Sequence, residues 1–177
     1  MKIGGIAGIE MDEVIINWLR SHQEYALIIV PAIAFVEACL GIGLFVSGII
    51  LLTVCTILYT ENIATLAQML PLAFLGATTA DHSGYYLGRW IGPRFHHTKF
   101  AIKQKKTLDK AESLIVKFGE FAIIFGRLMT AIRSLVPLLT GVSGLSRLKY
   151  SLYDLLACAI WTAGLGLLIV GFDKLFT

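Results

Sequence analysis

The sequence predicts an all-α integral membrane protein with two broken, re-entrant helical hairpins, each followed by a transmembrane helix. Two observations predict this class. Of the 177 residues, 56% are hydrophobic and only 15% are charged, whereas an ordinary soluble domain is about one quarter charged. In addition, several apolar runs approach or exceed the roughly 20 residues that a bilayer crossing takes. A soluble domain of this size would need more polar residues to cover its surface.

Residues 1–24 form an N-terminal segment ahead of a single membrane domain, residues 25–177. Five apolar residues fall toward one helical face, with acids and Arg20 elsewhere: Ile9, Val14, Ile15, Trp18 and Leu19. This pattern predicts a short amphipathic helix on the membrane surface; a partly ordered terminus is the alternative. The order of residues is not that of a signal peptide, so we expect the N-terminus to be retained.

Residues 25–60 are apolar almost throughout and contain one acid, Glu37, and no Lys or Arg. A run of about 35 residues is too long for one upright transmembrane helix and slightly short for two. We therefore expect a helix that breaks between Gly41 and Gly48, then a second segment from about Ile49. Broken backbone is tolerated at membrane depth only where protein or a watery cavity covers its amides. The first hairpin therefore predicts an internal cavity.

Residues 64–91 are predicted to form a transmembrane helix that contains Asp81 and His82. Small residues recur along one face of this helix: Gly76, Gly84, Gly88 and Gly92. Such faces let transmembrane helices approach closely, so helix packing is the expected role of these glycines, and they also allow a homodimer.

Most of the cationic residues gather in residues 89–117, so residues 93–118 are predicted to form a basic loop and, from Thr107, a surface helix. The positive-inside rule places this segment in the cytoplasm; binding of anionic headgroups is the alternative role of its lysines. The formal net charge of +3 is too small to indicate nucleic-acid binding.

Residues 119–141 carry two arginines, Arg127 and Arg133, inside an apolar run. Ten Phe, Ile, Leu and Val residues favour insertion by roughly 3–6 kcal/mol, and two central arginines oppose it by roughly 5–7 kcal/mol. The arginines therefore need partners or water. On a continuous helix they would point about 240° apart, but a break between or just after them lets both face one cavity. We assign the break to Pro137 and Gly141 and predict a second re-entrant hairpin.

Residues 150–172 are predicted to form the last transmembrane helix, with Asp154 near its start. Each half of the chain thus has a broken apolar segment with a charge, followed by a helix with one acid. Internal repeats whose broken helices meet at the midplane are typical of transporters, so the pattern suggests an inverted repeat.

Three stretches resemble the DedA family, also called SNARE-associated Golgi or VTT-domain proteins. Residues 80–95 resemble its block G-D-x-x-x-Y-x-x-G-R-x-x-G, with Ala80 in place of the first glycine. Residues 126–144 resemble G-R-F-x-P-x-x-R-x-x-x-P-x-x-A-G, with matches at Gly126, Arg127, Arg133, Pro137 and Gly141. Residues 36–52 resemble its glutamate followed by P-G-acid: Glu37 and Gly48 match, whereas Ser47 and Ile49 replace the proline and the second acid.

The resemblance implies a multi-pass lipid transporter of the cell (inner) membrane that moves undecaprenyl phosphate or a phospholipid with proton coupling. It implies functional roles for Glu37, Arg127 and Arg133, with Asp81 as a further candidate, and Ile49 removes one expected carboxylate. The chemistry of the residues agrees, because arginine offers paired donors to phosphate oxygens, while a buried Glu37 beside an arginine is suited to exchange a proton. A static ion pair that only joins the two hairpins is the alternative.

Other classes of function fit the sequence less well. The stretch Gly141–Gly144 has the G-x-S look of an intramembrane serine protease, but no histidine follows it, so we expect no enzyme activity. Adjacent His96 and His97 rarely face one ion, so we expect neither a metal nor another cofactor. A proton-coupled exporter of small cations and an envelope-integrity scaffold remain the alternatives to lipid transport.

Overall fold

The computed structural model describes residues 17, 21, 23–39, 48–103, 105–129 and 132–176, which contain helices and turns and no β-strand. The apolar face predicted within residues 1–24, and Gly41 and Gly43 of the first predicted break, lie outside the described residues. The helices are α2 (Gln23–Ala38), α3 (Ile49–Thr60), α4 (Leu66–Ile91), η1 (Gly92–His97), α5 (Lys99–Lys103), α6 (Lys105–Phe118), η2 (Gly119–Phe121), α7 (Ala122–Leu128), α8 (Leu135–Val142) and α9 (Arg147–Phe176).

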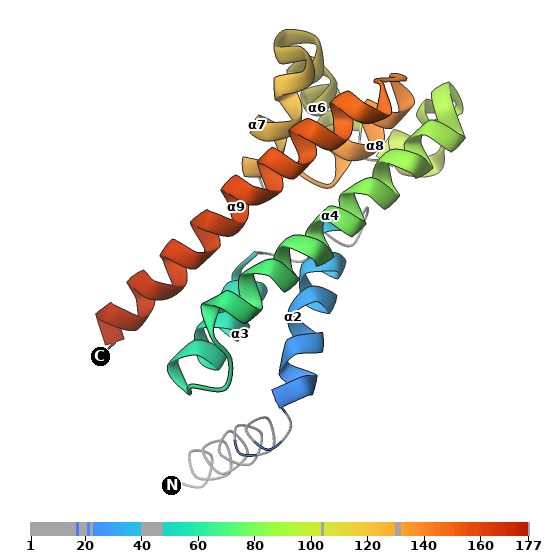
Figure 1. Ribbon diagram of the computed structural model, residues 1–177. Helices are drawn as coiled ribbons and strands as arrows, with labels where there is room; N and C mark the ends of the chain where they lie inside the picture. The colour runs from blue at the N-terminus through green and yellow to red at the C-terminus, as the bar shows by residue number, and fades with distance from the viewer. Residues whose placement is uncertain are drawn as a thin grey trace, which may run out of the picture.

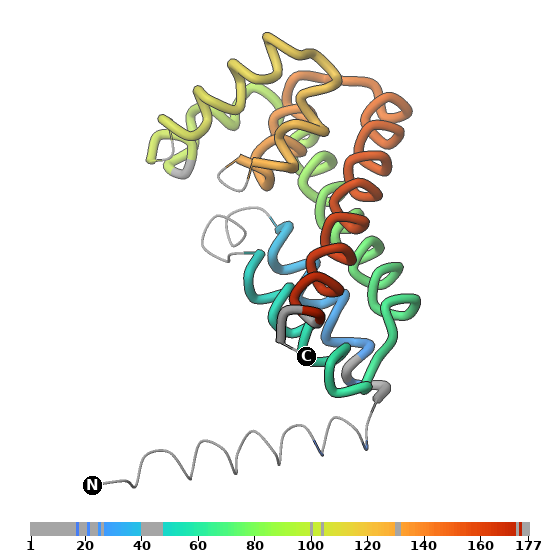
Figure 2. The backbone as a smooth tube through the Cα atoms, turned by 90° about the vertical axis from the view of Figure 1, so that its left-hand side faces the viewer, coloured from blue at the N-terminus to red at the C-terminus, as the bar shows by residue number. Residues whose placement is uncertain are grey.

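Two long helices, α4 and α9, run in opposite directions and form the centre of the fold (Figure 1). With 26 and 30 residues, they measure about 39 and 45 Å at 1.5 Å per residue. Helices α2 and α3 lie at one end of this pair, and α6, α7 and α8 lie at the other (Figures 1 and 2). The ends of the short helices meet near the middle of the molecule (Figure 2).

Two glycines of α4 allow close packing of a short helix at each end of α4, α2 at one end and α8 at the other. A Cβ atom at Gly76 would overlap the backbone of Pro31 in α2, and one at Gly88 would overlap the Leu138 carbonyl in α8. In return, a Cβ atom at Gly141 of α8 would overlap the Tyr85 carbonyl of α4. The packing role predicted for the glycines of α4 is therefore confirmed at Gly76 and Gly88, whereas a Cβ atom at Gly92 would meet no atom within 4 Å. These contacts lie within one chain, so the glycines no longer argue for a homodimer.

One helix among the described residues is long and apolar enough to cross a membrane, the stretch Arg147–Phe172 of α9. It begins three residues before the predicted span at Tyr150, so Arg147 and Lys149 lie in its first turn. Helix α4 has the length, but Asp81 and His82 interrupt its apolar sequence, and its crossing stays a prediction. The apolar stretches Leu27–Ala38 and Ile49–Thr60 are each too short to cross a hydrocarbon core about 30 Å thick.

The helix of the second predicted hairpin breaks between the two arginines, since α7 ends at Leu128 and α8 begins at Leu135. The assignment of this break to Pro137 and Gly141 was wrong. Pro137 is the third residue of α8, where a missing N–H costs no helical hydrogen bond, and Gly141 lies inside α8 against α4. The basic segment also differs from the prediction, because η1 and α5 precede a helix that begins at Lys105.

The contacts between helices repeat from one half of the chain to the other. Helix α2 packs on α4 as α7 packs on α9, and α3 packs on α9 as α8 packs on α4. The short helices also contact each other within each pair, α2 with α3 and α7 with α8. The contact pattern is thus unchanged when α2, α3 and α4 are exchanged for α7, α8 and α9.

Candidate functional site

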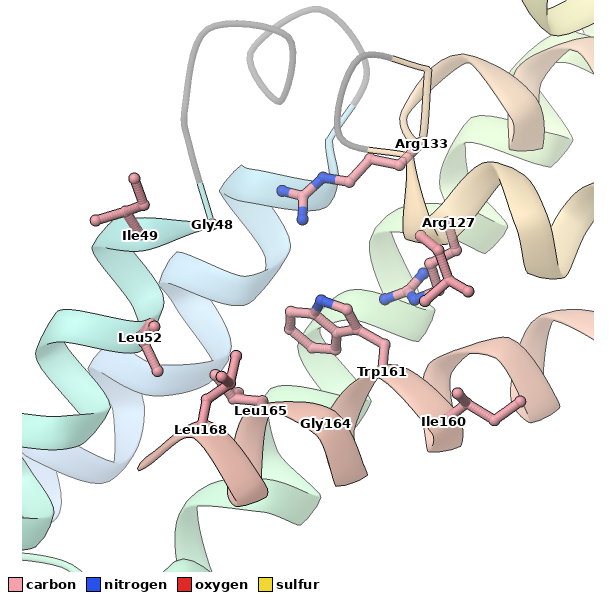
Figure 3. A pocket seen from close by; sticks show the side chains of 11 residues that line it. Gly48, Ile49, Leu52, Arg127, Arg133, Ile160, Trp161, Gly164, Leu165 and Leu168 are labelled. Atoms are coloured by element: carbon pink, nitrogen blue, oxygen red, sulfur yellow. The ribbon is translucent and has the colours of Figure 1, made fainter. Parts of the chain in front are cut away.

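A cavity of about 580 Å³ lies where the two pairs of short helices meet α9 (Figure 3). Its lining comes from α3 and the residue before it (Gly48, Ile49, Leu52), from α7 and the break after it (Arg127, Leu128, Arg133), and from α9 (Ile160, Trp161, Gly164, Leu165, Leu168). Ile49, Leu128 and Leu168 are also exposed on the outer surface. The cavity therefore has an apolar mouth and two guanidinium groups in its wall.

Arg133 connects the break between α7 and α8 to the end of α2. Its Nη2 atom lies 2.7 Å from Oε1 of Glu37 and donates a hydrogen bond of 2.7 Å to the Glu37 carbonyl oxygen. Glu37 is 1% exposed and belongs to the last turn of α2, where carbonyls have no partner within the helix. Arg133 thus neutralises the buried carboxylate and donates to a carbonyl at the C-terminal end of α2. The C-terminal end of a helix is the end that favours positive charge.

Arg127 connects α7 to α4 through an ion pair between its Nη1 atom and Oδ2 of Asp81. Both side chains are buried, at 9% exposed for Arg127 and 3% for Asp81. The guanidinium carbon of Arg127 also lies 5.2 Å from the centre of the Trp161 ring, a cation–π distance. Figure 3 shows Arg127 and Trp161 next to each other on the cavity wall. The sequence predicted that a break would let both arginines face one cavity, and they do.

Two glycines allow these ion pairs to form. Gly48 precedes α3, and a Cβ atom there would lie 3.0 Å from Oε1 of Glu37, so a side chain would press on the Glu37–Arg133 pair. Gly126 precedes Arg127, and a Cβ atom there would lie 2.5 Å from a methyl group of Val136. Gly126 therefore lets α7 and α8 pack closely enough to place Arg127.

A second group of polar side chains lies behind Arg127, and sequence reasoning gave it no role. Oδ2 of Asp154 lies 3.2 Å from Nδ1 of His82, and Nε2 of His82 lies 3.0 Å from Oγ of Ser151. Asp154 is 1% exposed. The signal in the sequence was a histidine and an aspartate inside two apolar runs, but no local pattern shows that α4 and α9 bring them together.

The acidic groups in this region do not make a good metal site. Among the described residues, Asp81, Asp154 and Cys158 have ligand atoms within 4.8 Å of one another. However, Arg127 is paired with Asp81, and its positive charge opposes a cation at the same carboxylate. His96 lies elsewhere, on η1, with Nδ1 3.4 Å from Oε1 of Glu112.

The sequence profile of one protein family, the VTT domain, matches residues 44–170 of this chain. The chain belongs to the VTT-domain family. This membrane-protein family is the DedA family that the motifs resemble, and the match includes both arginines and Asp81.

Relatives with membrane-protein names agree with the VTT-domain assignment. The inner membrane protein YabI of Escherichia coli (strain K12) is 28% identical over 85% of this chain and 59% of its own length. The uncharacterized membrane protein BU139 of Buchnera aphidicola (subsp. Acyrthosiphon pisum) is 25% identical over the same shares. The uncharacterized membrane protein slr0232 of Synechocystis is 33% identical over 51% of this chain and 43% of its own length.

The chain matches about three fifths of the length of the first two of these relatives. No solved structure shows a significant match to it. The comparisons therefore establish a membrane protein of the VTT-domain family, and its activity has to be inferred from the site.

Proposed function

We propose that this protein translocates a phosphate-bearing lipid, such as undecaprenyl phosphate or a phospholipid, across the cytoplasmic membrane. One observation carries the proposal: Arg127 and Arg133 line the same cavity, and the mouth of that cavity is apolar and exposed. A lipid needs both features at once, because its phosphate needs compensating charge inside the membrane and its acyl chains need an apolar exit.

The arginines provide the recognition chemistry. A guanidinium group donates two parallel hydrogen bonds to phosphate oxygens, and such charge-assisted bonds are about twice as strong as neutral ones. A cavity of about 580 Å³ lies in the usual range for ligand sites, about 300–1,000 Å³. The headgroup would bind between Arg127 and Arg133 while the chains remain among Ile49, Leu128 and Leu168.

Proton coupling follows from the ion pairs. When a phosphate draws Arg133 or Arg127 away, Glu37 or Asp81 is left buried without its cation, a costly state for a carboxylate. Taking up a proton removes that cost. Ile49 stands where the DedA motif has an acid, and it lines the cavity mouth, so Glu37 and Asp81 are the acids that remain to couple protons to lipid movement.

The proposed placement in the membrane uses both long helices. In this arrangement α4 and α9 cross the bilayer, and the pairs α2–α3 and α7–α8 enter it from opposite sides as re-entrant hairpins. The repeated contact pattern supports an inverted repeat, since each hairpin packs on α4 and α9 in the same way. Residues 93–118 would then face the cytoplasm, in line with the positive-inside rule.

A proton-coupled exporter of small cations is the second candidate, and the buried acids Glu37, Asp81 and Asp154 are the observation in its favour. The ion pairs weigh against it, because Arg127 and Arg133 neutralise two of the three acids and repel cations. We propose no catalytic activity, and an envelope scaffold needs neither the cavity nor its arginines.

The test is lipid movement in proteoliposomes with an imposed pH gradient. Two lipids should be compared, a fluorescent phospholipid and undecaprenyl phosphate, with wild type, Arg127→Ala, Arg133→Ala and Glu37→Gln. Arg94→Ala is the matched control, because Arg94 is an exposed arginine on η1 away from the cavity.

We expect Arg127→Ala and Arg133→Ala to lose transport of one or both lipids, and Arg94→Ala to transport both lipids like wild type. In Glu37→Gln, lipid movement should no longer depend on the pH gradient. If wild type moves neither lipid, the proposal is refuted. Export of a cation that depends on Glu37 would then favour the second candidate.

A further inference from the structure

Ionisable side chains continue from Arg127 to the edge of the α4–α9 interface. Asp81 is paired with Arg127, and its carboxylate lies within 4.8 Å of that of Asp154. Asp154 in turn lies 3.2 Å from Nδ1 of His82. Asp81 and Asp154 are buried, at 3% and 1% exposed, whereas the His82 side chain is 24% exposed. Proton-binding groups thus lie within 4.8 Å of one another from the cavity wall to the partly exposed His82.

The charges in this series do not balance without an additional proton. Two carboxylates, Asp81 and Asp154, are buried close together, and Arg127 compensates one negative charge. Two neighbouring buried carboxylates cannot both ionise without compensation, so the second needs either a bound proton or a protonated His82. In both cases the pair His82–Asp154 holds one proton that can exchange.

The surroundings leave His82 as the group that can take this proton from outside. Helix α9 faces it with Asp154, Ser151 and Tyr150, whose ring centre lies 5.3 Å away, and Cys158 contacts Asp81 from the same helix. Helix α8, which packs on α4, contains no ionisable residue, and the paired Glu37 at the end of α2 lies on the cavity side. The basic residues of η1, from Arg94 to His97, follow the end of α4 and lie at least 12 residues beyond His82.

We propose that His82, Asp154 and Asp81 form a proton relay that loads Asp81 from the α4–α9 edge when a lipid phosphate withdraws Arg127. The inference deepens the proposed function and rests on it. It assigns the entry of the coupling proton to His82 and not to the cavity, and it adds two residues to the coupling machinery, His82 and Asp154.

The step balances with one proton. The phosphate takes the hydrogen bonds of Arg127, and Asp81 receives a proton from the His82–Asp154 pair. His82 then replaces that proton from water through Nε2, the ring nitrogen next to Ser151. When the lipid leaves, Arg127 returns to Asp81, and the proton on Asp81 passes to water in the cavity, so that one proton enters at His82 and one leaves at the cavity in each cycle. No bond other than O–H and N–H bonds forms or breaks.

The order Ser151, His82, Asp154 is also that of a serine-hydrolase triad. Ser151 is the fifth residue of α9, however, and backbone N–H groups at and beyond this position bond within the helix. A hydrolase would need free donors beside the serine for its oxyanion. The geometry therefore supports proton transfer and not acyl transfer.

The first test measures gradient-driven lipid movement in proteoliposomes for His82→Gln and Asp154→Asn, with His96→Gln as the control on exposed η1. We expect both relay variants to move lipid only at the rate seen without a gradient, and His96→Gln to match wild type. Added imidazole should restore the gradient-driven rate in His82→Gln, because it replaces the lost proton carrier, and not in Asp154→Asn.

The outcomes separate the two proposals. If wild type moves no lipid, the proposed function fails, and the relay fails with it. If wild type is gradient-driven and both relay variants behave like it, the relay alone is wrong, and the proton enters from the cavity.

The second test reads the shared proton directly and does not need transport. The chain has four histidines, His22, His82, His96 and His97, whose ring signals can be followed by NMR against pH in detergent micelles. We expect Asp154→Asn to move the titration of His82 and to leave that of His96 in place. An unchanged His82 titration in a folded Asp154→Asn variant would overturn the relay even if transport is lost.

Discussion

The ion pair between Arg127 and Asp81 gives the sharpest quantitative prediction, through the variants Arg127→Met, Asp81→Asn and the double variant. Removing one partner of a buried ion pair costs about 3–5 kcal/mol, because the other charge stays buried. We expect Arg127→Met to lie near about 5 kcal/mol, the upper end of that range, because it leaves Asp81 facing Asp154 within 4.8 Å. Asp81→Asn should lie near about 3 kcal/mol, the lower end, because Asp154 offers Arg127 another carboxylate.

The double variant separates pairing from unrelated damage. It leaves neither buried charge unpaired, so its loss should be smaller than the sum of the single losses by at least about 2 kcal/mol, a coupling typical of residues in direct contact. The measurement is denaturant-induced unfolding in detergent micelles followed by helix content. Losses that simply add would refute the ion pair as the stabilising contact.

Transport by the same variants tests the role of the arginine. Arg127→Met and the double variant should not move lipid, whereas Asp81→Asn should still bind the phosphate but lose proton coupling through this acid. A double variant that is both stable and active would refute a role for Arg127 in headgroup binding. A stable, inactive double variant would show that its role exceeds holding α7 on α4.

Three further predictions test packing, the cavity and pH. Gly88→Ala should lower the free energy of unfolding by about 1–3 kcal/mol, as overpacking does, since its Cβ atom would overlap the Leu138 carbonyl. The control Gly171→Ala adds its Cβ atom to open space and should leave stability equal or higher. Equal losses for the two variants in thermal unfolding would contradict the close packing of α4 on α8. Gly164→Leu should lower lipid transport without lowering stability, since the added side chain enters open space in the cavity lining; unchanged transport would show that headgroups bind elsewhere, and Gly171→Leu is its control. The pKa of Glu120 lies below its ordinary value of 4.5, chiefly because Lys149 donates a hydrogen bond of 2.8 Å to it. A lowered carboxyl pKa stabilises the fold above the unfolded-state pKa, and that stability is lost as pH falls through the folded-state pKa. Wild type should therefore lose a small stability increment below about pH 4.5 that Glu120→Gln lacks at every pH; identical pH profiles in thermal unfolding would refute it.

The sequence located the charged side chains of the site but not their partners. Arg127, Arg133, Glu37 and Asp81 stand out because a charge inside an apolar run is costly unless it is compensated. Which acid meets which arginine depends on how α2, α4 and the two short helices pack, over 96 residues between Glu37 and Arg133 and 46 between Asp81 and Arg127. No local pattern contains that information.

Helix positions were predicted well where the apolar pattern is long, and less well where the chain turns. Helix α4 ends at the predicted Ile91, and α3 begins at the predicted Ile49. Pro137 was misassigned because the same residue that breaks a helix interior is well tolerated in a first turn, and only the position of the helix start distinguishes the two. The basic segment was expected to begin as a loop because its first residues show no periodic apolar pattern. Phe95 and Ala101 are nevertheless buried and pack this segment against the other helices.

Helix α4 packs more closely against α2 and α8 than against α9, and this difference has a mechanical consequence. Helices α2, α4 and α8 touch backbone to backbone, at Gly76 against Pro31 and at Gly88 and Gly141 across the α4–α8 contact, so they form a stiff plate. The cavity is lined from α3, α7, α9 and the residues beside them, and none of its lining comes from this plate. Gly166 of α9 meets α4 through the flexible side chain of Leu70, so α9 has freedom that the plate lacks. Any change in the volume of the cavity should therefore come from rocking of α3, α7 and α9 against a plate that keeps its shape.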